Sequence, residues 1–255
     1  MYNKLGLYIY CIIPFNQERN FGPIGINGED VLTIGYENIA MVVSGHPIGK
    51  LVVNKDNMLT HEKVVEEVMK EFDCVLPVRF GTVAASADEV RNLLDRRFRE
   101  FKNALRDMDH MVELSVKAKW KHMDVVFKEI EEGNKEIRAA KKIAKTSKSG
   151  NHDDARVQIG KMVEEALIKK KEESAEDIVD SLRRTSYDYR LNKTTGDDMF
   201  MNAAFLVGKG KELEFDFIME DISEEFKDEI DFKYSGPFPV YNFVNIAIYP
   251  EDWEK

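Results

Sequence analysis

The sequence predicts an α+β protein built from two domains. Strand patterns and helix patterns are mixed in each half of the chain, which favours two α+β domains. A length of 255 residues suits one or two domains, and a hydrophobic content of 43% suits a buried core. We expect residues 1–108 to form a mixed N-terminal α+β domain and residues 109–255 to form a modified ferredoxin-like domain with a long helical hairpin.

The first half reads as strands followed by two helices. A helix is expected from about Thr60, and a second helix begins at Ser86, where Glu89 completes a capping box. Pro77 cannot donate a hydrogen bond to a neighbouring strand, so its segment should be an edge or bulged strand. Glycines at 22, 25 and 28 mark a loop or hairpin after the first strand. The expected strands are 5–13, 31–37, 39–45 and 75–81.

The second half begins with the alternating strand 112–120. Helical periodicity then runs from Met123 to Ala144 and again from Ile159, with the polar turn 145–154 between the two helices. Strands are expected at 200–208, 230–236 and 241–249, with an acidic helix after the first of them. The order is close to the split βαβ arrangement of ferredoxin-like folds with an enlarged first crossover.

Charge and cysteine usage limit the class of protein. The net charge is −10, and residues 212–232 hold ten acids and one base, which fits a solvated helix face and argues against a nucleic-acid partner. Cys11 and Cys74 lie in apolar runs, so we expect buried free thiols in a cytoplasmic protein. The apolar run 5–13 is expected to be a strand rather than a signal peptide, and no membrane span is expected.

Motifs for chemistry are weak throughout. No two of the five histidines lie four residues apart, and His61 is expected at a helix surface or cap, so no metal site is predicted. The GKGK segment 208–211 lacks the spacing of a phosphate-binding loop, and no nucleophile elbow is present. The basic run 138–148 could touch an anionic surface, but a helix end that complements its own dipole is favoured. We predict no catalytic residue, cofactor or small-molecule substrate.

Two irregular apolar segments are candidates for contact with a partner protein. One is VLPVRFGTV (75–83), and the other is YSGPFPVYNFV (234–244), in which prolines alternate with aromatic residues. A rigid, packed connection explains such punctuation equally well. The candidate partner-binding residues are Pro77, Arg79, Phe80, Phe238, Tyr241 and Phe243.

Several stretches together resemble the gas vesicle protein F/L family, GvpF/GvpL. They follow one another from residue 5 to about residue 249, and VLPVRFGTV, MNAAFLV and GPFPVYNFV are the most specific of them in combination. The others are LGLYIYCI, IAMVVSG, HEKVVEEVM, VELSVKAKW and IGKMVEEAL.

The resemblance implies a cytoplasmic accessory or minor structural protein of gas vesicles, the gas-filled protein shells that give cells buoyancy. Such a protein is expected to bind the small shell protein GvpA and other Gvp proteins, and to carry no cofactor and no catalytic residue. It also implies two α+β domains, the second a modified ferredoxin-like fold. The alternative is a ligand-binding or enzymatic protein, because ferredoxin-like folds host many functions.

Overall fold

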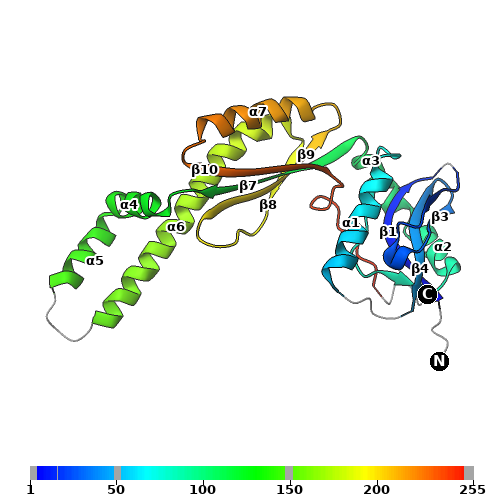
Figure 1. The fold of residues 1–255 in the computed structure, drawn as a ribbon, viewed down its shortest axis with the longest axis horizontal. Helices are drawn as coiled ribbons and strands as arrows, with labels where there is room; N and C mark the ends of the chain where they lie inside the picture. The colour runs from blue at the N-terminus through cyan, green and yellow to red at the C-terminus, as the bar shows by residue number, and fades with distance from the viewer. Residues whose placement is uncertain (1–4, 16, 49–52, 147–151, 250–255) are drawn as a thin grey trace. The chain divides into compact units, whose positions relative to one another are not determined.

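The structure is a computed structural model that describes residues 5–15, 17–48, 53–146 and 152–249 (Figure 1). Its contacts divide the chain into two compact units. Unit 1 comprises Met1–Glu113 and Pro237–Lys255, and unit 2 comprises Leu114–Gly236. This division differs from the expected domains 1–108 and 109–255, because the chain returns to unit 1 for its last segment.

Unit 1 is built around one sheet in the order β2-β3-β4-β1-β5, with β6 also paired to β1. The strand β5 lies at the end of this order, as expected for a segment that contains Pro77. It is shorter than the predicted strand 75–81 and contains only two residues. The strands are β1 Leu5–Pro14, β2 Asn20–Gly22, β3 Val31–Tyr36, β4 Ile39–Pro47, β5 Leu76–Pro77 and β6 Val83–Ala84.

Helices cover both faces of this sheet. Helix α1 packs on one face through Val64, Val65 and Val68, in a cluster that includes Tyr8 and Tyr10 of β1. Helices α2 and α3 pack on the other face. The helices are α1 Lys55–Met69, α2 Ala87–Arg96 and α3 Phe98–Asp107. The interior therefore has two layers of side chains, one on each side of β1.

A bulge in β1 explains why consecutive residues of this strand share a face. The register against β4 shifts between Ile9 and Cys11, so Tyr10 is an extra residue in β1. Tyr10 and Cys11 both pack in the α1 layer, whereas Ile9 packs in the α2–α3 layer. Both cysteines, Cys11 and Cys74, are buried free thiols, as expected from the sequence.

The ends of the helices follow local capping chemistry. Helix α1 begins at Lys55, before the predicted Thr60, because the Asn54 side chain accepts a hydrogen bond from the Asn57 amide. Helix α2 has the predicted capping box, in which the Glu89 amide donates to Ser86 Oγ. The single helix expected from Ser86 is interrupted at Arg97, which separates α2 from α3.

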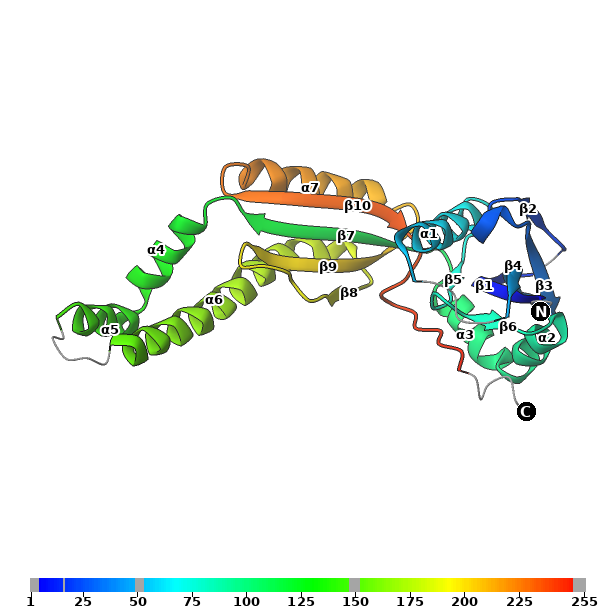
Figure 2. The ribbon, with the colours of Figure 1, turned by 60° about the horizontal axis from the view of Figure 1, so that its bottom comes forward.

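Unit 2 contains a four-stranded sheet in the order β10-β7-β9-β8 (Figure 2). Strands β7 and β8 are separated by β9, and β9 and β10 are separated by β7, which is the double split βαβ pattern of a ferredoxin-like fold. The predicted fold class is confirmed. The strands are β7 Met111–Trp120, β8 Asp188–Leu191, β9 Met199–Gly208 and β10 Ile230–Phe238.

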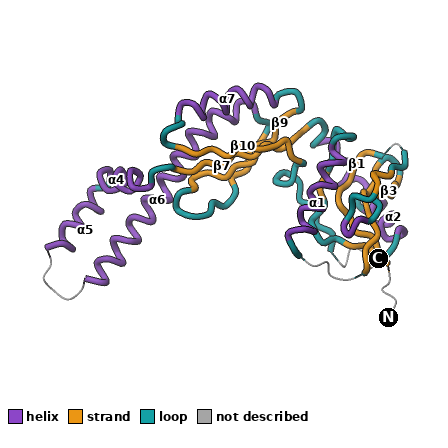
Figure 3. Tube along the Cα trace, in the orientation of Figure 1, coloured by secondary structure: helices purple, strands orange, loops and turns teal. Residues whose placement is uncertain are grey.

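Helices α6 and α7 contact each other in unit 2, and α6 also contacts β9. Phe205 of β9 and Phe215 of α7 lie 5.3 Å apart between ring centroids, and Phe215 stacks on Tyr234 of β10 at 5.7 Å. The enlarged crossover consists of α4, α5 and a long α6, and the first part of α6 runs beside α5 (Figure 3). The bounds are α4 Met123–Gly133, α5 Lys135–Thr146, α6 His152–Leu182 and α7 Glu212–Glu225.

Three predictions for the second half were wrong. The helix expected from Met123 to Ala144 is two helices, because Asn134 is extended at the end of α4 and its side chain accepts from the Glu136 and Ile137 amides at the start of α5. Strand β8 was not predicted, because its DYRL sequence has only one strongly apolar residue. The strand expected at 241–249 is an irregular segment, which makes one parallel bridge between Ile246 and Val78. The predicted turn 145–154 lies partly outside the described residues, and α6 continues without a break through Ser174.

Candidate functional site: a cleft beside strand β5

The segment after β5 forms the first wall of a cleft in unit 1. Residues 78–82 leave the sheet through a tight turn in which Gly81 has a φ of +89°, a conformation that favours glycine. The Thr82 hydroxyl donates to the Arg79 carbonyl at 2.7 Å, and the Val78 amide donates to the Tyr10 carbonyl at 3.0 Å. These bonds fix the backbone that carries Arg79 and Phe80.

His61 of α1 supports this wall from beneath. The Gly81 amide donates to the Tyr8 hydroxyl at 3.2 Å, and that hydroxyl is hydrogen-bonded to His61 Nδ1 at 2.8 Å. Because the N–H of the neutral His61 ring donates to the Val78 backbone, Tyr8 is the donor to Nδ1. The Phe80 ring packs edge-on against the His61 ring, with centroids 5.7 Å apart. The predicted surface or capping role of His61 is therefore wrong, because its side chain is 3% exposed in the middle of α1.

Burial sets the protonation state of His61. Desolvation lowers its pKa to about 4, and a hydrogen bond to the Val78 backbone opposes this shift only in part. With Nδ1 accepting from Tyr8, the proton of the neutral ring lies on Nε2. Both ring nitrogens are committed to internal bonds, so His61 positions the wall and is unsuited to proton transfer near neutral pH.

The returning C-terminal segment forms the second wall. Its backbone pairs with the first wall where the Arg79 amide donates to the Ile246 carbonyl at 3.2 Å. The guanidinium of Arg97, at the α2–α3 break, donates to the Ala247 carbonyl at 2.9 Å. Ile246 is 4% exposed and belongs to the same cluster as the α2 and α3 side chains. The segment is thus part of the core of unit 1.

A buried carboxylate anchors the start of this segment. Glu113, which is 4% exposed, accepts one hydrogen bond from the Asn242 backbone amide at 2.7 Å and another from Asn242 Nδ2 at 2.6 Å. Burial raises the Glu113 pKa, and the two bonds from Asn242 oppose that rise. The pair holds Tyr241 and its neighbours at the end of β10.

The cleft between the two walls has a volume of about 290 Å³. Helix α1 closes it with Met58, His61 and Glu62. Arg79 and Glu62 are the charged lining residues, one of each sign, and the other lining residues are mostly apolar. Burial raises the pKa of Tyr241, and Glu62 is among the acidic neighbours that raise it further, so the phenol stays neutral. A site of this kind suits an apolar side chain rather than a reacting group.

Comparison with known proteins identifies the family. The family model described as gas vesicle synthesis protein GvpL/GvpF matches residues 6–245. The chain belongs to this family. It therefore has a role connected with gas vesicles.

Relatives of this family are similar along nearly their whole length. Gas vesicle protein F of Microcystis aeruginosa is 25% identical over 244 residues, which cover 95% of this chain and 99% of the relative. Gas vesicle protein F1 of Halobacterium salinarum is 27% identical, with 95% and 94% covered. The crystal structure of GvpF from Anabaena sp. PCC7120 matches with a TM-score of 0.82 at 23% identity, covering 95% of this chain and 99% of that one. This last match supports the fold.

Four of the six predicted contact residues of this GvpL/GvpF chain line the cleft: Pro77, Arg79, Phe80 and Tyr241. Phe238 and Phe243 do not line it, although both are half-buried in the same returning segment. The sequence did not indicate that Met58, His61 and Ile246 also line the cleft. The one sequence signal for His61 was its position four residues before Val65, which places it on the apolar side of the helix.

The described residues also bear on metal binding and on membrane spanning. Among these residues, no three His, Cys, Asp or Glu side chains gather in a group that could hold a metal ion. No helix in the described part of the chain has the length and apolar character needed to cross a bilayer.

Proposed function

We propose that this chain is a cytoplasmic assembly protein of gas vesicles, which binds the small shell protein GvpA and other Gvp proteins and catalyses no reaction. Its membership of the GvpL/GvpF family over residues 6–245 is the observation that carries this proposal. A shell subunit must present an apolar surface to the gas, and before assembly such a surface is liable to aggregate. A protein that covers the surface until assembly would prevent this.

The cleft beside β5 is the proposed contact site for the shell protein. Its walls carry Phe80, Tyr241 and Ile246, and the apolar surface continues onto α1, where Met58 is 45% exposed and Leu59 is 41% exposed. Arg79 and Glu62 at the cleft would orient a partner through one charge of each sign. Phe238 and Phe243 would act indirectly by shaping the returning segment.

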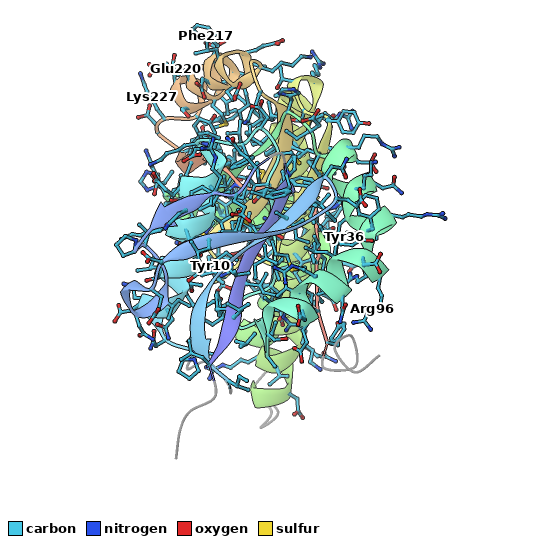
Figure 4. All side chains as sticks on the ribbon, turned by 90° about the vertical axis from the view of Figure 1, so that its right-hand side faces the viewer. Tyr10, Tyr36, Arg96, Phe217, Glu220 and Lys227 are labelled. Carbon is cyan, nitrogen blue, oxygen red and sulfur yellow. The ribbon has the colours of Figure 1, made fainter. Side chains whose placement is uncertain are left out.

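Paired substitutions test the cleft directly. Phe80→Asp and Tyr241→Asp should each reduce co-purification of GvpA with this chain at least about tenfold, because a charge in an apolar contact must be desolvated. Phe217→Asp on α7 is the matched control, since Phe217 is 65% exposed and lies outside the cleft (Figure 4). Thermal melting would check that each variant folds.

Two outcomes would count against the proposal. Unchanged GvpA binding by both cleft variants would show that GvpA does not bind at the cleft. Normal vesicles, seen by electron microscopy in cells that lack the gene, would show that the protein is not needed for vesicle assembly.

A further inference from the structure

Unit 2 has an open groove between α6 and its edge strand β8. The groove has a volume of about 580 Å³. Its floor is apolar, with Ala175 5%, Val179 3% and Met201 1% exposed. Ile168 and Leu191 line the same groove but are 52% and 58% exposed. Strand β8 is the last strand in the sheet order, so this side of the sheet is open to a further element.

One wall of the groove carries a row of carboxylates. Glu172, Glu176 and Asp180 follow one another at four-residue spacing on α6, and all three line the groove. Asp180 pairs with Arg183 at 3.2 Å, and no ion pair with a described residue is found for Glu172 or Glu176. Three bases also line the groove: Lys171, whose Nζ donates to the Gly196 carbonyl at 2.8 Å, Arg183, and Lys193, which follows β8 on the other wall. Like charges four residues apart repel, so a basic partner would relieve this row.

Helix α5 of the same chain has the complementary surface. Its sequence contains five bases and one acid. Ile137, fully buried, packs against Leu167 of α6, whereas Ile143 is 68% exposed. Arg138 and Lys142 are exposed and four residues apart, next to Ile143. The outer face of α5 therefore presents one exposed apolar side chain beside two exposed basic side chains.

We propose that α5 of one copy docks in the α6–β8 groove of a second copy of this chain. Ile143 would cover the apolar floor, and Arg138 and Lys142 would face Glu172 and Glu176. Both rows repeat every four residues, so their charges have the same rise of about 6 Å along their helices. Charge and apolar surface thus match in one docking position.

The arrangement of the two surfaces makes this association open-ended. The side of α6 that packs toward α4 and α5 carries Val163 and Leu167, whereas the groove side carries Ala175 and Val179. A helix turns by 360° every 3.6 residues or so. On that geometry, the mean direction of the α6 residues that pack toward α4 and α5 is nearly opposite to the mean direction of the α6 residues that line the groove. A copy docked in the groove therefore leaves its own groove facing away. Such a head-to-tail contact continues from copy to copy instead of closing as a pair.

Sedimentation velocity of the full-length chain tests this proposal. The mean mass should rise with protein concentration beyond that of a dimer, and the association should weaken as salt is raised, because exposed charges are screened. Glu172→Lys with Glu176→Lys, or Arg138→Glu with Lys142→Glu, should each raise the apparent dissociation constant at least about tenfold. An equimolar mixture of these two variants should associate again, because each groove then meets an α5 of opposite charge.

Glu220→Lys with Glu224→Lys on α7 is the matched control, because it changes the net charge equally at two exposed positions outside the groove. This variant should associate like the original chain. A chain that stays monomeric at every concentration overturns the proposal and leaves a basic helix of another protein as the occupant of the groove. Association that the charge changes in α5 and α6 do not alter also overturns it.

Discussion

His61 shows how one buried side chain can shape a binding cleft without touching a reacting group. It accepts from Tyr8, contacts the Val78 backbone and packs against Phe80, so it joins α1 and β1 to the wall of the cleft. A buried neutral histidine also makes folding depend on pH. The folded pKa is about 4, compared with about 6.5 for an exposed histidine.

The sign of this pH dependence follows from the lowered pKa. Between the two values the unfolded chain binds the extra proton and the folded chain does not, so stability falls as the pH is lowered. From about pH 7 to about pH 5, His61 should cost about 2 kcal/mol of unfolding free energy. His61→Gln should remove this part of the pH dependence in urea unfolding, whatever it does to stability at pH 7.

His122→Gln, at an exposed position, is the matched control for the substitution itself. Glu113 acts in the opposite direction, because a carboxyl whose folded pKa is raised loses stability as the pH rises. Only the difference between variant and original therefore isolates His61. Equal slopes for His61→Gln and the original chain would show that the buried ring does not control acid unfolding.

Helices and strands with strong local patterns were predictable from the sequence. The alternation of residues 112–120 gave β7, and the spacing of Ser86 and Glu89 gave the start of α2. The short strands β2, β6 and β8 were missed, because two to four residues carry too little pattern and form only beside a longer strand. Residues 241–249 have the composition of a strand, yet they meet the sheet at one bridge only.

The proposed contact site was predictable only in part, because its residues come together through contacts that are distant in the chain. Prolines and aromatic residues indicated both walls of the cleft from the sequence. Their meeting depends on a backbone bond between Arg79 and Ile246, which are far apart in the chain. No local pattern encodes such a contact, and the part played by Met58 and His61 depends on how α1 packs.

The capping box of α2 allows a test at a single helix end. Ser86→Ala should lower the unfolding free energy by about 1 kcal/mol, because the Glu89 amide loses its acceptor. Ser181→Ala on α6 is the control, since that hydroxyl donates only to the Asp177 carbonyl of its own helix. A cost for Ser86→Ala no larger than that of the control would mean that water replaces the cap without loss.

Unit 1 is completed by a segment that follows unit 2 in the chain. Unit 2 is inserted between the first 113 residues and the returning segment of unit 1. Val240 and Ile246 of this segment are 2% and 4% exposed, so they are core residues of a unit whose other residues come from the start of the chain.

Removal of the returning segment should therefore weaken unit 1 selectively. A chain that ends at Gly236 loses the buried side chains of Val240 and Ile246, each of which stabilises the fold by about 2 kcal/mol. Hydrogen exchange should speed up in β1 and α1 and stay unchanged in β9. Protection of β1 equal to that in the original chain would contradict the assignment of this segment to the core of unit 1.

Unit 1 is completed late in biosynthesis. A ribosome makes Asn242 and Ile246 after the whole of unit 2, so unit 1 is begun before unit 2 and completed after it. Until then, the Arg79 amide lacks its acceptor and Glu113 lacks both of its donors. A product of premature termination would carry half a cleft and a loosened core, which a cellular protease could cut. Only a chain translated through Ile246 can therefore form both walls of the cleft.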